Sequence, residues 1–484
     1  MIRITPRGLV YVYIAMLILE GALRKWVVPG SISKYIGIIR DPIALYLLWN
    51  GLLKGHWRRH WMFDLWWGVG VLLAVAGLLA MITDPYPLNV WVFGLRIALL
   101  HFPLIFIIPH LLGPEDLEIL MRRLILLALP IALLMVWQYR SDADAWVNRT
   151  AFEGGSLLQA AGKVRPPGPF SFNTGAAEYF ALINAFLMAG LLNERLPLPW
   201  IVYGGASTLL AYSVSGSRLM FGYLSIVWFG TLGLRWLARP RWPSFNQLVQ
   251  IVAGLVLIVL LISFTPLGNF INEGRQTTEH RATTANKEDG GFFGRGLRMF
   301  SIPDHILWQP QLFGRGIGIG SNYGSSLIIG KAGFVLEENE WPRVIQESGL
   351  IVGSLFIAFR LVMTLYVGLS VWKPLLRGDV LPTALFFSNT VIIVVGNIGR
   401  PTSQGFTVLS MAFALTAARW SPSRASALIQ SPASPYPSLA LSGSGVHGPA
   451  ATTQLQAAGR GGSPSSAEFA PAGALPPADP FAPR

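Results

Sequence analysis

A strongly charged loop turns into a long apolar segment at residues 337–353, EENEWPRVIQESGLIVG. This stretch holds four acidic residues, an arginine and a proline, and the apolar run that follows continues to residue 370. A helix needs about 20 predominantly apolar residues to cross the hydrocarbon core of a bilayer. The pattern therefore predicts a membrane-spanning helix over 346–370 with charge concentrated at its N-terminal end. Such charge is costly close to lipid and usually marks a functional position.

The composition of the whole chain is typical of a membrane protein. Of its 484 residues, 52% are hydrophobic and only 13% are charged, and the mean hydropathy is +0.49. Soluble domains have about 25% charged residues, so much of this surface is expected to face lipid. We interpret the net charge of +13 as basic cytoplasmic loops and expect no nucleic-acid partner. Cysteine is absent, which excludes disulfides, thiolate nucleophiles and cysteine-based metal sites.

The apolar segments predict an all-α membrane protein with about twelve transmembrane helices. No small-residue cleavage site follows the first segment, so we expect it to remain in place as a signal anchor. The predicted spans are 8–26, 35–53, 62–82, 89–109, 121–138, 174–193, 197–215, 217–237, 247–266, 346–370, 381–398 and 404–419. The second span carries Arg40 and Asp41, either as an intramembrane functional pair or as a helix-end pair at the interface.

The charges of the connecting loops predict the orientation in the membrane. Short basic loops such as KGHWRRH (54–60) follow the even-numbered spans, and positive charge is retained on the cytoplasmic side. Both termini are therefore expected in the cytoplasm, and the long loops 139–173 and 267–345 outside it. Arg24 and Lys25 fall in the first outer loop and depart from this rule.

The chain divides into two parts of different composition. Residues 1–420 hold all the predicted spans, whereas residues 421–484 are rich in Pro, Ala, Ser and Gly and lack apolar periodicity. A segment of that kind cannot bury enough apolar surface to offset the entropy lost on ordering. We therefore predict a polytopic membrane domain over 1–420 and a disordered cytoplasmic tail over 421–484.

The large extracytoplasmic loop 267–345 is where chemistry is expected. Loops of this length are usually functional or disordered, and this one carries eight basic and eight acidic residues. Arginine suits a phosphate ligand because its planar guanidinium donates two parallel hydrogen bonds. A carboxylate suits a general base. The glycine-rich run FGRGIGIGSNYG (313–324) lacks the βαβ context of a dinucleotide loop, and no HExxH motif occurs, so we expect neither cofactor nor metal.

Four stretches, which follow one another along the chain, form a further pattern. They are RPPGPFSFNTGAAEYFAL (165–182), AYSVSGSRLMFGYLSIV (211–227), GRGLRMFSIPDHILWQPQLFGRGIGIGSN (294–322) and ENEWPRVIQESGLIVG (338–353). Together they resemble the O-antigen ligase and polymerase family of polytopic membrane glycosyltransferases. The corresponding family segments contain an Arg followed by an N–A pattern, an SR helix start, an Arg-containing run ending in repeated glycines, and HN followed by nine residues and Gly.

The resemblance, which covers roughly residues 160–400, implies a function. Members of this family transfer a glycan from undecaprenyl pyrophosphate to an acceptor on the outer side of the bacterial inner membrane, in O-antigen or exopolysaccharide ligation and polymerisation. It also implies a fold like that of the all-helical C-type glycosyltransferases, a lipid-linked glycan donor, and a glycan or lipid-linked acceptor. No nucleotide sugar, cofactor or metal is implied.

The resemblance also assigns roles to individual residues. Arg218 matches the Arg of the SR motif, and Arg295 matches the Arg of the large loop, with Arg298 as a close competitor for the second role. The two arginines would hold the donor pyrophosphate and stabilise the charge as it leaves. Glu338 stands in place of the family's His; we expect it to be buried at the membrane edge and to accept the proton of the acceptor hydroxyl. Further candidates for substrate binding are Arg315, Asn339, Arg165 and Asn173.

Each catalytic assignment has a structural alternative. Arg218 also suits a helix start at the outer interface, where a long side chain reaches toward water. Arg295 also suits a solvated loop, and Glu338 also suits the first turn of a helix, where the helix dipole favours an acid. Glu347, farther along, is expected to pack or pair within the helix start.

Two other functions stay open. A transporter or flippase of lipid-linked glycans would have inverted repeats and charges near the bilayer midplane, for which Arg40, Asp41, Arg96 and Arg360 are candidates. A family member that has lost catalysis is the other possibility, because the family's His is absent.

Overall fold

The computed structural model describes residues 5–30, 32–57, 60–151, 159–160, 163–193, 195–239, 298–308, 311–330, 333 and 335–421. Within them the protein is all-α, apart from a two-residue antiparallel ribbon that pairs Gln159 with Val164 and Ala160 with Lys163. Three predictions fall outside the described residues: the span 247–266, the role of Arg295, and the tail 421–484, of which only Ser421 is described.

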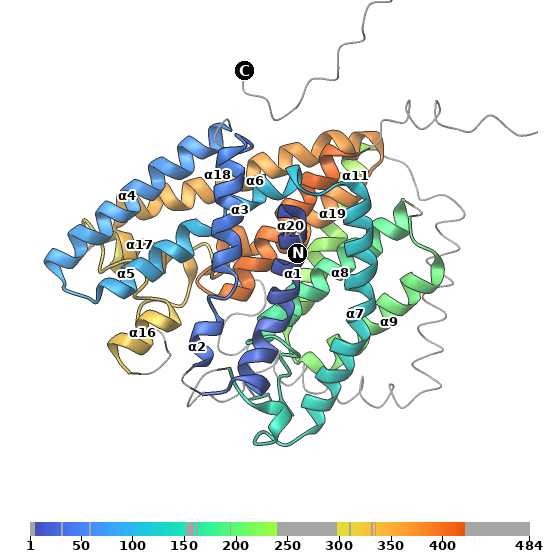
Figure 1. Ribbon diagram of the computed structural model, residues 1–484, viewed down its shortest axis with the longest axis horizontal. Coiled ribbons are helices and arrows are strands. Elements are labelled where there is room, and N and C mark those ends of the chain that lie inside the picture. The colour runs from blue at the N-terminus through green and yellow to red at the C-terminus, as the bar shows by residue number, and fades with distance from the viewer. Residues whose placement is uncertain are drawn as a thin grey trace, which may run out of the picture. The chain divides into compact units, whose positions relative to one another are not determined.

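The first half of the chain forms a series of helices, several of which are interrupted (Figure 1). They are α1 (Pro6–Ala22), which continues into the π-helical η1 (Leu23–Val27), α2 (Ser33–Ile36), α3 (Asp41–Leu53), α4 (Trp61–Thr83), α5 (Leu88–Leu95), which continues into the π-helical η2 (Arg96–Leu100), α6 (Leu104–Ile107), the 3-10 turn η3 (Ile108–His110) and α7 (Pro114–Arg140).

The second half contains the ribbon and the remaining helices. In order they are η4 (Trp146–Asn148), β1 (Gln159–Ala160), β2 (Lys163–Val164), α8 (Asn173–Leu192), α9 (Leu198–Ser215), α10 (Arg218–Ser225), η5 (Ile226–Gly230), α11 (Thr231–Ala238), α15 (Asp304–Trp308), α16 (Asn322–Ile328), α17 (Glu340–Ser348), α18 (Leu350–Arg377), α19 (Leu381–Val395) and α20 (Pro401–Arg419).

Six helices among the described residues are long and apolar enough to cross a membrane: Pro6–Val27, Trp61–Thr83, Leu88–His110, Pro114–Arg140, Asn173–Leu192 and Leu350–Arg377. They coincide with six of the twelve predicted spans. The segment predicted at 35–53 is divided, because α2 ends at Ile36 and α3 begins only at Asp41, with Pro42 in its first turn. With 15 residues, α19 is shorter than the roughly 20 that a bilayer core requires.

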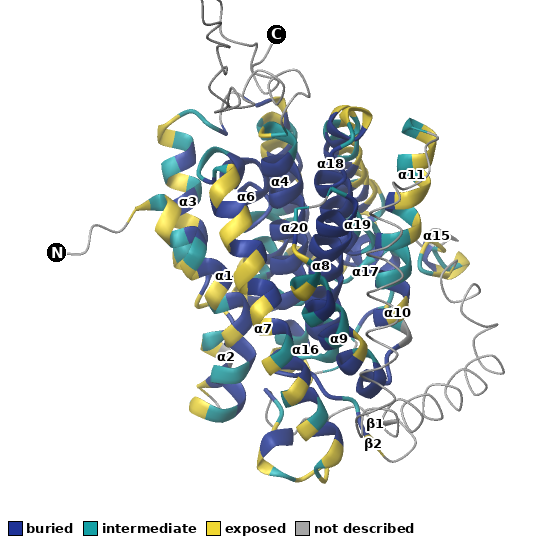
Figure 2. Ribbon diagram, turned by 90° about the vertical axis from the view of Figure 1, so that its right-hand side faces the viewer, coloured by how far each residue is buried: buried dark blue, intermediate teal, exposed yellow. Residues whose placement is uncertain are grey.

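The helix α8 lies at the centre of the packing and has no lipid-facing side. Its apolar window is 100% buried, and it packs against α9, α10, α19 and α20. Gly175 and Gly190 allow side chains of neighbouring segments, such as Thr402 and Leu196, to approach its backbone closely. Figure 2 shows the buried residues gathered in α8 and α20, with exposed residues on outer helices such as α1 and α3.

Arg24 and Lys25, the exceptions to the charge rule, are buried inside the protein. The Lys25 ammonium donates to the carbonyls of Gly168 and Phe170 at 2.5 and 3.0 Å. The Arg24 guanidinium donates to the carbonyl of Ala151 at 3.1 Å. These charges therefore hold the segments before β1 and after β2 against η1, and they carry no information about the side of the membrane.

A sharp break at Gly349 separates α17 from the long helix α18. Gly349 has φ 80° and ψ 164°, a combination that is essentially restricted to glycine. A Cβ at this position would lie 2.2 Å from the carbonyl oxygen of Leu312. The break lets α17 turn away from the axis of α18 and present a separate face to the protein interior.

We predict that Gly349→Ala destabilises the protein by about 3 kcal/mol or more, because it combines backbone strain with a backbone clash. Gly330→Ala is the matched control: Gly330 has φ 71° with open space around it, so only strain of about 1–2 kcal/mol is expected. Thermal unfolding of the purified protein in detergent, followed by tryptophan fluorescence, measures both. Equal losses in the two variants would contradict the clash at Gly349.

Candidate functional site

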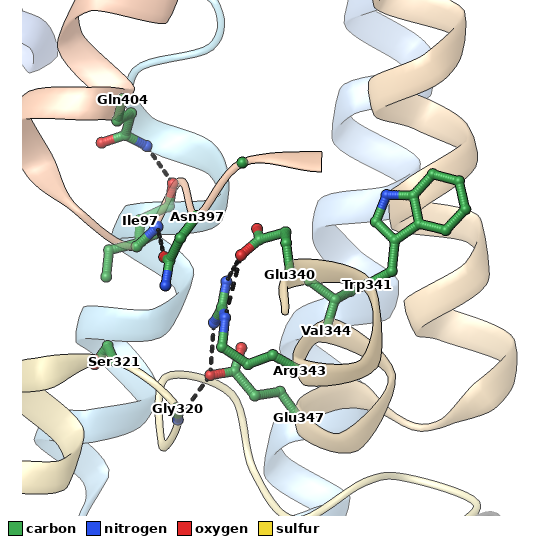
Figure 3. A network of polar contacts seen from close by, with 12 residues as sticks. Ile97, Gly320, Ser321, Glu340, Trp341, Arg343, Val344, Glu347, Asn397 and Gln404 are labelled. Atoms are coloured by element: carbon green, nitrogen blue, oxygen red, sulfur yellow. Dashed lines mark hydrogen bonds and ion pairs between the residues drawn. The ribbon is translucent and has the colours of Figure 1, made fainter. Parts of the chain in front are cut away.

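A buried chain of charges lies along one face of α17. Glu340, Arg343 and Glu347 are spaced i, i+3 and i+7, which places them on the same side of a helix. The Arg343 guanidinium contacts Glu340 Oε2 at 2.6 Å through Nη2, and Glu347 Oε1 at 2.9 Å through Nη1. All three residues are buried, and Figure 3 shows the arginine between the two carboxylates.

A second arginine, Arg360 of α18, completes the charge balance. Its Nη1 contacts Glu340 Oε1 at 2.6 Å. Its other donors bind the carbonyl oxygens of Ile393 at 2.8 Å, Gly396 at 3.0 Å and Ile392 at 3.1 Å. These carbonyls belong to the C-terminal end of α19, where the helix dipole favours a cation. The network thus contains two guanidinium groups and two carboxylates, and it joins α17, α18 and α19.

A small cavity of about 30 Å³ lies beside Arg343 and Glu347. Its wall also includes Ile97, Gly318 and Ser321, and the backbone N–H of Gly320 donates to Glu347 Oε1 at 2.8 Å. A cavity of this size has room for about one or two water molecules. It can hold a water or a small ion against the Arg343–Glu347 pair, but it cannot hold a sugar.

The two carboxylates differ in pKa. Burial by itself raises the pKa of a carboxyl, and a nearby guanidinium lowers it. Glu340 contacts both Arg343 and Arg360, whose combined charge outweighs burial, so its pKa lies below the ordinary value. For Glu347, burial and the neighbouring charge of Glu340 outweigh the single contact to Arg343, so its pKa is raised. Glu347 is therefore the carboxyl of this network that takes up a proton more readily.

Several residues predicted from the sequence come together around the ends of α17. Asn339 is the N-cap of the helix, and its Nδ2 donates to the carbonyl of Arg298 at 3.4 Å. The backbone N–H of Arg315 donates to the carbonyl of Gln346 at 2.8 Å, near the other end. The side chains of Arg298, Arg315 and Glu338 are exposed. The prediction that Glu338 is buried is wrong: the buried acids are Glu340 and Glu347, which lie on the inner face of α17, whereas Glu338 precedes the N-cap of the helix and is exposed.

The remaining predicted residues lie on other elements. Asn173 is the first residue of α8, Arg165 follows β2, and Arg218 is the first residue of α10, directly after Gly216 and Ser217. Arg295 lies outside the described residues.

The connection between α19 and α20 (residues 396–400) lies between α17 and the N-terminal end of α8. The guanidinium of Arg400 lies 5.4 Å from the ring centre of Phe172, next to Asn173. On the other side, a Cβ built on Gly399 would lie 4.0 Å from Nη2 of Arg343.

Sequence reasoning gave most weight to Glu338 and missed the network behind it. The i, i+3, i+7 spacing of Glu340, Arg343 and Glu347 was the available signal, and so was Arg360, an arginine inside an apolar span. The expectation that Glu347 pairs within the helix start is confirmed. Among the described residues no group of three or more His, Asp or Glu is arranged to hold a metal ion.

No family model, no curated protein and no solved structure matches this chain. The sequence and the fold together therefore identify a multi-pass helical membrane protein, with a lipid bilayer as its expected surroundings.

We predict strong energetic coupling between Glu340 and Arg360. Either Glu340→Gln or Arg360→Met alone leaves a buried charge with fewer partners, and breaking a buried pair in this way costs about 3–5 kcal/mol. The double variant should lose much less than the sum of the two. Thermal unfolding of the four proteins in detergent gives the coupling. Losses that add to within about 0.5 kcal/mol would show that the two residues act independently.

We also predict a pH-dependent contribution from Glu347. Its pKa is raised on folding, so its stabilising effect is complete below the ordinary value of 4.5 and is lost as the pH rises through the folded-state pKa. The free energy of unfolding of Glu347→Gln should therefore rise relative to that of wild type between pH 4.5 and 8. The expected rise is about 1.4 kcal/mol for each unit by which folding raises the pKa of Glu347. Unfolding temperatures of the two proteins across this pH range measure the difference. Parallel curves for the two proteins would contradict the raised pKa. Glu340→Gln is the comparison with the opposite sign and a lower pH range: the pKa of Glu340 is lowered on folding, so its stabilising effect is present above 4.5 and is lost as the pH falls below that value.

Proposed function

We propose that this chain is a bacterial inner-membrane glycosyltransferase of the O-antigen ligase and polymerase type. It would transfer a glycan from an undecaprenyl-pyrophosphate donor to an acceptor sugar on the extracytoplasmic side. The four sequence stretches that resemble this family and the multi-pass helical fold support the proposal. The reaction would take place at the N-terminal end of α17, where Glu338 is exposed and Glu340 contacts Arg360 of the span α18.

The observation that carries this proposal is the contact between Asn339 and Arg298. These residues are far apart in the sequence, yet the Asn339 side chain donates to the Arg298 backbone at 3.4 Å. The contact brings an exposed arginine near Glu338, the residue that stands in place of the family's His. An exposed arginine and an exposed carboxylate thus belong to neighbouring segments, which supports their assignment as phosphate-binding group and general base.

The proposed reaction is a single displacement. Glu338 accepts the proton of the acceptor hydroxyl as its oxygen attacks the anomeric carbon. The bond between that carbon and the pyrophosphate oxygen breaks, and the lipid pyrophosphate leaves with the electron pair. Arg298, together with Arg218 and Arg295, would stabilise the charge that develops on the leaving group.

The buried network gives this surface a fixed support. Glu340 directly follows Asn339 in the chain, and its contacts with Arg343 and Arg360 hold the first turn of α17 against α18. The indole Nε1 of Trp341 adds a hydrogen bond of 2.8 Å to the carbonyl of Val394. Displacement of this turn by about 1 Å would be enough to reduce a reaction that depends on position. We therefore assign the network a positioning role.

A second candidate function is transport of a lipid-linked glycan. Buried ion pairs in membrane helices favour it, because such charges often mark transport pathways. Arg360 is buried in α18, and Arg96 in the span Leu88–His110 pairs with Asp41. The enzyme remains the preferred proposal because three of the residues assigned from the resemblance, Arg298, Glu338 and Asn339, come together at the N-terminal end of α17, where Arg298 and Glu338 are exposed.

We predict that Glu338→Ala abolishes transfer. A strain lacking the chain, complemented with this variant, should accumulate lipid-linked glycan, with product reduced by about 100-fold or more, as expected for loss of a general base. Glu338→His should restore part of the product, since His can take the same role. Surface-glycan profiles and extracted lipid-linked glycan are measured together, with membrane levels of each variant.

The control is Glu118→Ala, which removes an exposed acid from α7 and should leave the profile at the wild-type level. A wild-type profile from Glu338→Ala would show that Glu338 is not the base. An unchanged profile in the deletion strain itself would exclude the proposed function.

A further inference from the structure

A second buried polar cluster lies where several membrane helices are irregular. The candidate span Leu88–His110 is α-helical only to Leu95, winds as a π-helix over Arg96–Leu100 and turns at His101 before α6 begins. The first span likewise ends in a π-helix, η1. Helices of this kind are frequent at functional sites, and broken membrane helices often surround ion sites. The polar side chains of these segments point toward one another.

Three of these side chains form a continuous hydrogen-bonded series. His101 Nε2 lies 3.3 Å from Asp41 Oδ1, and His101 Nδ1 lies 3.1 Å from the hydroxyl of Tyr13. Both contacts are satisfied when Nε2–H donates to the carboxylate and the Tyr13 O–H donates to Nδ1. Tyr13 and His101 are buried, whereas the side chains of Asp41 and Arg96 are 14% and 11% exposed. The series therefore leads inward from a partly exposed end.

Charged groups from α1, η1, η2 and the residue before α3 lie around the series, and α20 contributes a carbonyl. Arg40, just before α3, donates to the Tyr13 hydroxyl at 3.4 Å and contacts Glu20 of α1 at 3.2 Å. Arg96 of η2 binds Asp41, with one contact of 2.8 Å from Nη2. Arg24 of η1 lies 3.6 Å from Glu20. From α20, the carbonyl of Pro401 accepts from Arg40 at 2.6 Å.

We propose that Asp41, His101 and Tyr13 form a proton-binding site within the membrane domain, separate from the α17 site. When the site takes up one proton, the imidazole gains an Nδ1–H, and the hydrogen bond to Tyr13 reverses so that Nδ1–H donates to the phenol oxygen. The added positive charge lies next to the Asp41 carboxylate, which already accepts from Nε2–H. The Asp41–Arg96 end is partly exposed, and the proton would enter there. Such a site makes the conformation of the interrupted span Leu88–His110 sensitive to the proton concentration.

Nitrogen-15 NMR of histidine-labelled full-length protein in lipid nanodiscs tests this directly. The His101 signals are those that are missing in His101→Gln. In wild type they should show the Nε2–H tautomer at high pH and change to imidazolium positions within the range pH 4–9. Asp41→Asn should move the midpoint by about one pH unit or more, and Tyr13→Phe should change the neutral tautomer ratio.

The matched control is His110→Gln, which removes another histidine of the same span and should leave the His101 titration unchanged. His101 signals that stay constant from pH 4 to 9 in wild type would overturn the proposal. Superimposable titration curves for wild type and Asp41→Asn would overturn it as well. If the Asp41 and Tyr13 variants do not fold, the wild-type titration decides. The result does not depend on whether the chain transfers glycans.

Discussion

The ion pair between Glu340 and Arg360 holds together the helices that carry the candidate site. A charge buried in a helical bundle that faces lipid is tolerated only when its partners are fixed, because an unpaired ion in a low-dielectric interior costs several kcal/mol. Arg360 meets this requirement with Glu340 and three carbonyls at the end of α19. Any shift of α17 against α18 would separate charges that have no water to replace the lost partner. The position of α17, and with it the exposed turn at Asn339, follows from this pairing.

The start of α20 connects this region with the second polar cluster. Its first turn accepts a hydrogen bond from Arg40 at Pro401 and donates one from Gln404 to the carbonyl of Ile97. Ser403 of the same turn donates to Glu178 of α8 at 2.5 Å. Ile97 also lines the cavity beside Arg343. One short turn therefore contacts the α8 core, the broken span and the surroundings of the α17 network, and a movement of that turn would alter all three.

The two polar regions suit different kinds of ligand. The cavity beside Glu347, at about 30 Å³, has room for water or a small ion only, and the Asp41–His101–Tyr13 series is suited to a proton. Under the proposed function, a glycan carried on a lipid pyrophosphate would bind at the N-terminal end of α17, where Arg298 and Glu338 are exposed. The buried charges of α17 would then position that end.

The sequence by itself determined that this is a multi-pass helical membrane protein, because apolar runs of bilayer length are a local property of the chain. It also indicated the region around 337–353 as unusual, since charge beside an apolar span is visible without a structure. The tertiary structure decided which of those charges are buried. Glu338 and Glu340 are two residues apart, yet one is exposed and the other is enclosed by two arginines, because α17 begins between them: Glu340 lies on its inner face, whereas Glu338 precedes the N-cap. Neither the pairing of Glu340 with Arg360, 20 positions away, nor that of Asp41 with His101, 60 positions away, could be read from the sequence. Such pairs depend on how separate helices break and pack, and no local pattern records that.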